Sequence, residues 1–82
     1  MEKTEILARI NHIAADLFNS PQLILKTDTV ASDVDGWDSL THIALLMEVE
    51  KTFKVRFKSS EVSSFSDVGQ LVDKVQTRLK AR

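Results

Sequence analysis

Three segments of this 82-residue chain repeat their apolar side chains at the spacing of an α-helix, and this pattern limits the fold more than any other feature. The segments cover residues 4–19, residues 38–53, and the stretch from residue 67 towards the C-terminus. The apolar residues are Ile6, Leu7, Ile10, Ile13, Ala14, Leu17 and Phe18 in the first segment, Leu45, Leu46, Val49 and Phe53 in the second, and Val68, Leu71, Val72, Val75 and Leu79 in the third. The spacing predicts an all-α protein.

The connections between these segments complete the predicted architecture. Pro21 marks the end of the first helix, and residues 19–37 form a long loop without a repeating pattern. Residues 54–58 alternate too briefly for a sheet and are interpreted as a connector, and residues 59–62 resemble a short capped helix. We expect one domain over residues 1–82, a small bundle of three main helices and one short helix. The apolar residues that can pin the long loop are Leu23, Ile24, Leu25, Val30, Val34 and Trp37.

Composition excludes several classes of protein. Without cysteine the chain has no disulfide framework and no thiol nucleophile, and its two histidines alone cannot make a structural zinc site. Paired carboxylates, metal ligands, a glycine-rich phosphate loop and a nucleophile with its base are all missing, so we predict neither an enzyme nor a metal protein. A charged N-terminus and the lack of a long apolar run predict a cytoplasmic protein without a membrane segment. We also expect a monomer.

The charges are segregated along the chain. Residues 27–50 contain six acids and no Lys or Arg, whereas residues 51–82 contain eight Lys or Arg residues and three acids. The net charge is only −1, and the helix that would have to enter a DNA groove is the acidic one. We therefore expect no nucleic acid partner, and an acidic patch that would attract a basic protein.

The second helix carries two apolar stripes. One stripe faces the core, and a second, formed by Leu40, Ile43 and Met47, lies on the opposite side with Glu50 at its border. Either another segment covers this second stripe or it is an exposed surface with an acidic rim on which a partner docks. We call Leu40, Ile43 and Met47 the docking stripe.

We interpret the side chains of His12, Trp37 and His42 as structural and not catalytic. His12 lies on the polar face of the first helix and is expected to be solvated. His42 projects near the core stripe, which favours a partly buried histidine bonded to a loop carbonyl over a catalytic base. Trp37 either anchors the loop against the bundle or frames a partner surface, and anchoring is the simpler role.

Asp38 and Ser39 stand together at the start of the second helix. Each is a good helix cap, so one of the two side chains is spare. Gly36-Trp37-Asp38-Ser39-Leu40 resembles the Asp-Ser-Leu attachment motif of acyl carrier proteins, and the sequence of helices around it resembles that family over essentially the whole chain.

The resemblance implies a function that the residues alone do not. Ser39 matches the serine that a phosphopantetheinyl transferase modifies with 4′-phosphopantetheine from coenzyme A, and Asp38 matches the aspartate beside the magnesium ion and phosphates during transfer. The cofactor thiol then holds acyl groups as thioesters, which an acyl-loading ligase or synthase supplies. Leu40, Ile43, Met47 and Glu50 match positions that contact partner enzymes.

The charge pattern departs from carriers of bacterial fatty acid synthesis, which are usually more acidic. Thr41, Ala44 and Lys51 stand where those carriers have further carboxylates. A specialised or secondary pathway, such as a polyketide-like or modified-sugar pathway, agrees better with this pattern. Two alternatives stay open: an aminoacyl or peptidyl carrier, and a helical interaction module that is never modified and in which Ser39 is only a cap.

Overall fold

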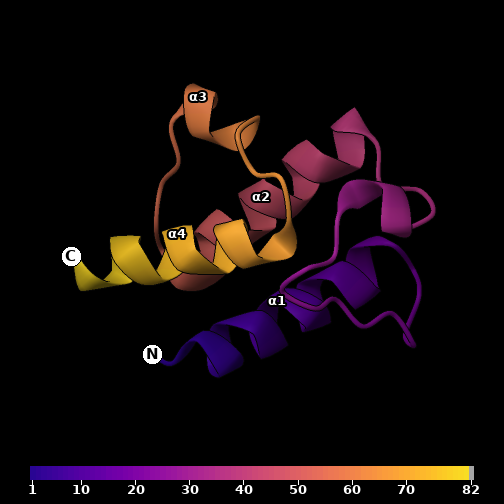
Figure 1. Cartoon of the computed structure of the whole chain (residues 1–82), viewed down its shortest axis with the longest axis horizontal. Coiled ribbons are helices and arrows are strands. Elements are labelled where there is room, and N and C mark those ends of the chain that lie inside the picture. Colours follow the sequence, from indigo (N-terminus) through magenta and orange to yellow (C-terminus); the bar gives the residue numbers. More distant parts are fainter. Residues whose placement is uncertain (82) are drawn as a thin grey trace.

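The computed structural model describes residues 1–81, and Arg82 lies outside them. The elements are α1 (Lys3–Leu17), the 3₁₀ turn η1 (Ala31–Asp33), α2 (Ser39–Phe53), α3 (Ser59–Val62) and α4 (Val68–Lys80). Of these four helices, α3 is short and the other three are long. Figure 1 shows how they are arranged, and residues 1–81 contain no strand. The predicted all-α bundle is confirmed.

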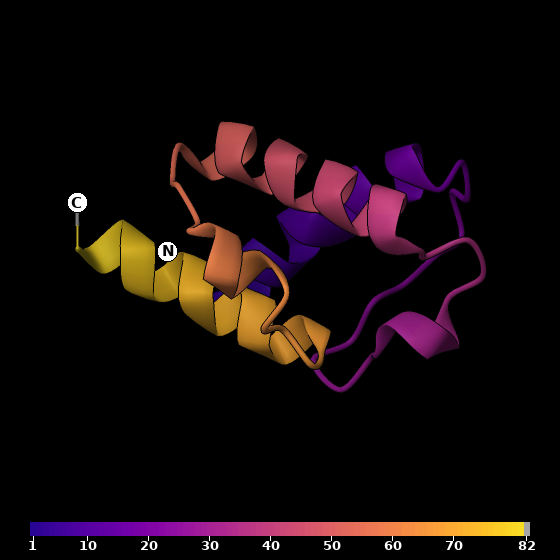
Figure 2. The same ribbon diagram turned by 90° about the horizontal axis from the view of Figure 1, so that it is seen from above.

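The core forms where α1 packs against both α2 and α4. The predicted apolar faces of all three helices supply its buried side chains, and Leu25 of the loop and Val55 of the connector complete it. Figure 2 shows the long loop at the end of the bundle that lies away from both chain ends. The buried residues are Ile6, Ile10, Ala14, Leu25, Leu45, Leu46, Val49, Phe53, Val55, Val68, Leu71, Val72 and Val75. Among residues 1–81, none of the helices has the length and apolarity needed to cross a bilayer.

The predicted end of the first helix was wrong by two residues. α1 ends at Leu17, Phe18 is its C-cap, and Asn19 takes the left-handed backbone conformation with φ of 52°. The apolar pattern continues through Phe18 because this ring packs on Trp37, with 5.6 Å between ring centroids. At Phe18 the apolar pattern therefore indicates burial of the side chain and does not indicate helical backbone.

The long loop is pinned to the bundle by backbone hydrogen bonds as well as by apolar contacts. The Asn11 side chain in α1 donates to the Leu25 carbonyl oxygen at 3.0 Å and accepts from the Leu25 N–H. At the start of α4, the Gly69 N–H donates to the Thr27 carbonyl oxygen at 2.8 Å. A Cβ atom at position 69 would lie 2.7 Å from that same oxygen, so this approach requires glycine.

One of the predicted loop anchors was wrong. Ile24 is 72% exposed, whereas its neighbour Leu25 is buried. Leu23, Val30, Val34 and Trp37 are partly buried, as the prediction requires. Ile24 points outward because the two hydrogen bonds between the Asn11 side chain and the Leu25 backbone hold the adjacent residue, Leu25, in the core.

The connector and the short helix follow the prediction. Residues 54–58 are irregular, and the chain turns at Lys54, which has φ of 56°. Glu61 then ties α3 to α4 through ion pairs with Lys74, at 3.2 Å, and with Arg78. This carboxylate also accepts the Lys58 N–H at 2.7 Å, which caps the first turn of α3.

Candidate functional site at the start of α2

Asp38 is the N-cap of α2. Its carboxylate accepts a hydrogen bond from the Thr41 N–H at 2.9 Å, and the Thr41 hydroxyl oxygen accepts one from the Asp38 N–H at 2.7 Å. This reciprocal pair satisfies two backbone donors at the helix start. The Thr41 N–H is the main reason that the pKa of Asp38 lies below its ordinary value, with the Thr41 hydroxyl as the next cause. Asp38 therefore stays ionised beside Ser39 well into the acidic range.

Ser39 is the first residue of α2 and is exposed. Because Asp38 supplies the cap, the serine hydroxyl is not needed for it, and no hydrogen bond among residues 1–81 uses this hydroxyl. The Ser39 hydroxyl is therefore accessible to another protein, and the ionised carboxylate of Asp38 is next to it in sequence.

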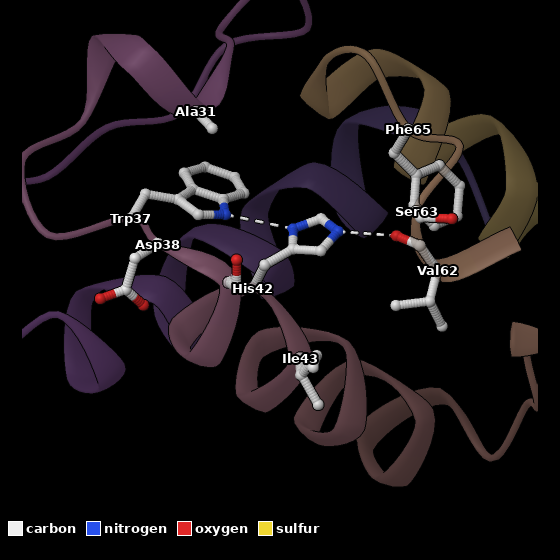
Figure 3. Close-up of a pocket in the computed structure, with 9 residues that line it drawn as sticks. Ala31, Trp37, Asp38, His42, Ile43, Val62, Ser63 and Phe65 are labelled. Atoms are coloured by element: carbon white, nitrogen blue, oxygen red, sulfur yellow. Dashed lines mark hydrogen bonds between the residues drawn. The ribbon is translucent and has the colours of Figure 1, made fainter.

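Trp37, His42 and Val62 form a chain of hydrogen bonds beside Ser39 (Figure 3). The indole N–H of Trp37 donates to Nδ1 of His42 at 3.1 Å, and Nε2 of His42 lies 2.7 Å from the carbonyl oxygen of Val62. The two bonds together require the neutral ring with its proton on Nε2. The predicted role of His42, a partly buried histidine bonded to a carbonyl, is confirmed.

The other two aromatic predictions are also confirmed. Trp37 is half-buried and packs between Phe18 and His42, so it anchors the loop. His12 is exposed on α1, with Nε2 at 4.0 Å from a carboxylate oxygen of Asp16.

A surface groove of about 510 Å³ opens next to Ser39. Its walls come from the loop, from α2 and from the segment after α3, as Figure 3 shows. Sequence reasoning missed this groove, because Val62, Ser63 and Phe65 are far from Ser39 in the chain and no pattern joins them. The lining residues are Ala31, Trp37, Asp38, Ser39, His42, Ile43, Val62, Ser63 and Phe65.

The docking stripe is exposed. Leu40, Ile43 and Met47 have 79%, 48% and 54% of their surface accessible, which excludes the alternative that other segments within residues 1–81 cover them. These three side chains form an apolar row that starts directly after Ser39. Glu50, predicted at the border of the row, turns its carboxylate to the connector and accepts the Phe57 N–H at 2.8 Å.

The two ends of the docking stripe differ in charge. Asp35 and Asp38 are exposed at the end that holds Ser39. At the other end, a hollow of about 550 Å³ is lined by Met47 together with Lys51, Lys54, Arg56, Glu50 and Val55. The docking stripe therefore runs from an acidic to a basic region. It follows α2, which joins the long loop at one end and the connector at the other (Figure 1).

Comparison with known proteins gives a consistent result, although no protein-family model matches the chain. The acyl carrier protein of Exiguobacterium sibiricum is 25% identical over 79 residues, which are 96% of this chain and 100% of that protein. The solution structure of the holo acyl carrier protein of Geobacter metallireducens matches with a TM-score of 0.85 and 32% sequence identity, covering 93% of this chain and 87% of that one. The chain belongs to the acyl carrier protein family.

A third relative is a much larger protein. The non-reducing polyketide synthase sorB of Penicillium rubens is 36% identical over 78 residues, and this match covers 94% of the carrier chain but only 3% of the synthase. Acyl carrier proteins are carriers and not enzymes, and the prediction that this chain is not an enzyme agrees with its relatives. The predicted fold and family are confirmed together.

Proposed function

We propose that Ser39 is the attachment site of 4′-phosphopantetheine in this carrier protein. The observation that supports it best is the exposed Ser39 hydroxyl, left without a hydrogen bond among residues 1–81 because Asp38 caps α2 in its place. The surroundings suit the group, since the hydroxyl faces solvent and a groove beside it can receive a flexible arm. When attached, the group supplies a terminal thiol that bonds acyl groups as thioesters.

The chain's own part in attachment is small. The Ser39 oxygen forms a bond to the phosphorus of coenzyme A that carries the pantetheine arm, the bond from that phosphorus to the nucleotide half breaks, and the serine proton leaves to a base of the transferase. The carboxylate of Asp38 is ionised and exposed, which suits a role beside the magnesium ion and phosphates during transfer. Its bonds to Thr41 hold the helix start, and thus Ser39, in a fixed position.

The docking stripe would bind the transferase and the enzymes that load or use the acyl group. An exposed apolar row next to the attachment point is the surface a partner would need to cover in order to reach Ser39. Glu50 is proposed to act at the edge of this contact, although its carboxylate is already engaged by the Phe57 N–H. A carrier that meets several enzymes in turn is proposed to be monomeric and cytoplasmic.

The charge pattern favours a specialised pathway. The basic residues at the far end of α2, Lys51, Lys54 and Arg56, set this chain apart from strongly acidic carriers. The similarity to part of a polyketide synthase is compatible with a polyketide-like pathway. A carrier of aminoacyl groups would use the same serine, and only the identity of the loading enzyme separates the two.

The experiment that tests the attachment site is intact mass spectrometry. Purified protein is incubated with coenzyme A, Mg²⁺ and a broad-specificity phosphopantetheinyl transferase, alongside Ser39→Ala and a matched control, Ser59→Ala. Ser59 is also an exposed serine at the first position of a helix. We expect one phosphopantetheine on the wild type and on the Ser59 variant, and none on the Ser39 variant. A folded wild type that gains no mass would favour the unmodified interaction module.

The docking stripe is tested in the same reaction with Leu40→Ala. Leu40 is 79% exposed, so its truncation should change stability by less than about 0.5 kcal/mol. If the transferase covers this side chain, kcat/KM for modification should fall by about tenfold, which corresponds to about 1.4 kcal/mol of lost binding. Ile24→Ala, an exposed apolar residue in the loop, is the control and should react like the wild type. Equal rates for both variants would place the contact elsewhere.

A further inference from the structure

A hollow of about 550 Å³ opens where α2 ends and the connector begins, and we call it the basic hollow. Lys51, Lys54 and Arg56 bring cations to its lining. Met47, the last residue of the docking stripe, and Val55, which is buried in the core, bring apolar surface to it. Its size lies within the range of ligand sites in proteins, so it is large enough to receive several side chains of another molecule.

The carboxylates around the basic hollow do not neutralise it. Its lining holds three cations and a single carboxylate, that of Glu50, which leaves a net charge of +2. Glu50 is also engaged already, because its carboxylate accepts a backbone N–H of the connector at 2.8 Å. Glu48 pairs with Lys51 at 3.5 Å. No ion pair within residues 1–81 uses the exposed side chains of Lys54 and Arg56, so these two cations can bind an anionic group from outside the chain.

The basic surface continues from the connector onto α4. A second hollow of about 270 Å³ shares Lys54, Val55 and Arg56 with the first and adds Arg78 and Ala81. Arg78 donates to the Arg56 carbonyl oxygen at 2.6 Å, which ties α4 to the connector. Figures 1 and 2 both show the connector end of α2 on the side of the bundle where α4 ends, away from the long loop. The cations are therefore held on a packed part of the fold.

The two charged ends of α2 are too far apart to neutralise each other. The helix has 15 residues, so at about 1.5 Å per residue it is about 22 Å long. The Debye length at physiological ionic strength is about 8 Å, so each end acts on a partner independently. A protein that covers the docking stripe therefore meets negative charge near Ser39 and positive charge near Met47. A uniformly basic surface would be attracted at the first end and repelled at the second.

A protein surface suits the basic hollow better than a membrane or a phosphate group. Met47 is exposed beside the cations, and an occupant with an apolar side chain among its carboxylates can bury this surface, whereas phosphate cannot. A flat anionic membrane laid against the docking stripe would meet the exposed Asp35 and Asp38 as well as the cations and would be repelled there. A protein can match both ends of the stripe with side chains of opposite charge.

We propose that the basic hollow is a recognition site for acidic side chains of a partner protein, and that Lys54 and Arg56 bind their carboxylates. Because Met47 belongs to both the docking stripe and the hollow, one partner covers both. That partner carries basic side chains opposite Asp35 and Asp38 and acidic side chains opposite the hollow. This inference rests on the proposed role of the docking stripe and adds the charge pattern that selects its partners.

The test is a titration of the isotope-labelled full chain with short peptides, followed by its backbone amide NMR signals. The acidic probe is a capped pentapeptide with two glutamates on each side of one leucine. In the second probe serine replaces the leucine, and in the third lysine replaces each glutamate. Each titration is run at about 20 mM and about 150 mM NaCl, because a contact between charges weakens as salt rises.

For the wild type, we expect the acidic probe to shift the amide signals of Lys51, Lys54 and Arg56 far more than that of Lys26, an exposed lysine of the long loop. Binding should weaken at the higher salt concentration. The serine probe should bind about threefold more weakly, since it buries no apolar side chain against Met47. The lysine probe should shift signals at the acidic end of the stripe and leave the basic hollow unchanged.

Lys54→Glu should weaken the binding of the acidic probe by about tenfold at low salt, because it replaces an attraction by a repulsion. The matched control is Lys26→Glu, which changes the net charge equally at an exposed position outside the hollow and should change the affinity by less than about twofold. Arg56→Glu should act like Lys54→Glu. It leaves the left-handed turn at residue 54 untouched, so it decides the outcome if the first variant does not fold.

Equal weakening by Lys54→Glu and Lys26→Glu, or acidic-probe shifts spread evenly over the exposed lysines, would overturn the proposal. So would inorganic phosphate that shifts the signals of the hollow as strongly as the acidic probe at equal charge, since the hollow would then attract any anion. Binding to phosphatidylglycerol vesicles that Arg56→Glu abolishes would assign the hollow to a lipid surface instead.

The transferase reaction on the same preparations decides the proposed function separately. A chain that gains phosphopantetheine on Ser39, with Leu40→Ala slowed as expected, but whose basic hollow ignores the acidic probe contradicts this inference alone. A chain that gains no phosphopantetheine but binds the acidic probe at the hollow contradicts the proposed attachment and supports the site for acidic proteins.

Discussion

Lys54 adopts a backbone conformation that glycine occupies more easily. It is the C-cap of α2 with φ of 56° and ψ of 46°, and its N–H donates to the Glu50 carbonyl oxygen. For a residue with a Cβ atom the left-handed conformation costs on the order of 1 kcal/mol. The turn is nevertheless required, since it reverses the chain so that Val55 enters the core.

Lys54→Gly should therefore raise the free energy of unfolding by up to about 1 kcal/mol, because glycine removes the steric cost of the turn. The control is Lys51→Gly, in the last turn of α2, where the backbone is helical and glycine should lower the free energy of unfolding by about 1 kcal/mol. Urea denaturation followed by circular dichroism measures both. Destabilisation of similar size in the two variants would show that the turn imposes no strain on lysine.

The prediction of individual residues from the sequence succeeded where local chemistry decides the outcome. Asp38 caps α2 because it directly precedes the helix, where its carboxylate can accept a hydrogen bond from the free Thr41 N–H. Glu50 shows the limit of this reasoning. A helical wheel puts it at the border of the docking stripe, but the turn at Lys54 brings the Phe57 N–H back to its carboxylate, a contact seven residues away that no helical wheel includes.

At the scale of elements, α3 depends on one carboxylate. The helix has only four residues and none of them is buried, so its own hydrogen bonds cannot hold it. Glu61, whose side chain is 14% exposed, accepts the Lys58 N–H and pairs with Arg78 and Lys74 of α4. The Lys58 N–H first, and then Arg78 and Lys74, lower the pKa of Glu61 from 4.5 to about 2.

This pKa predicts how stability depends on pH. Because the pKa of Glu61 is lower in the folded than in the unfolded chain, its stabilising effect is complete above about pH 4.5 and is lost as the pH falls towards 2. Glu61→Gln should lower Tm at pH 7 and reduce the further loss of Tm between pH 4.5 and 2. Thermal unfolding by circular dichroism at several pH values measures this.

Glu48→Gln is the control for that measurement, because Glu48 forms an exposed ion pair with Lys51 at 3.5 Å and such pairs contribute little to stability. If the Glu48 and Glu61 variants followed the same pH curve, the tie between α3 and α4 would not contribute to acid stability.

Across the whole molecule, the helices could be predicted from the sequence and the path of the long loop could not. Helices follow from a repeat within each segment, whereas the loop is fixed by pairs distant in sequence, such as Asn11 with Leu25 and Thr27 with Gly69. The same distinction applies to the site. Ser39 and the docking stripe are local features of α2, but the groove exists only because the loop, α2 and the segment after α3 converge.

Because the loop is tied to every long helix, we expect it to unfold together with them. Trp37 contacts Phe18 at the end of α1 and bonds to His42 of α2, and Thr29 and Thr27 accept backbone hydrogen bonds from the start of α4. Trp37 fluorescence, which senses the loop, and circular dichroism at 222 nm, which senses the helices, should therefore give coincident urea transitions. Asn11→Ala removes both side-chain bonds to Leu25 and should move the fluorescence transition to lower urea than the helical one, whereas Gln22→Ala, at an exposed position of the same loop, lies outside these ties and serves as a comparison. Separate transitions in the wild type would mean that the loop opens while the bundle stays folded.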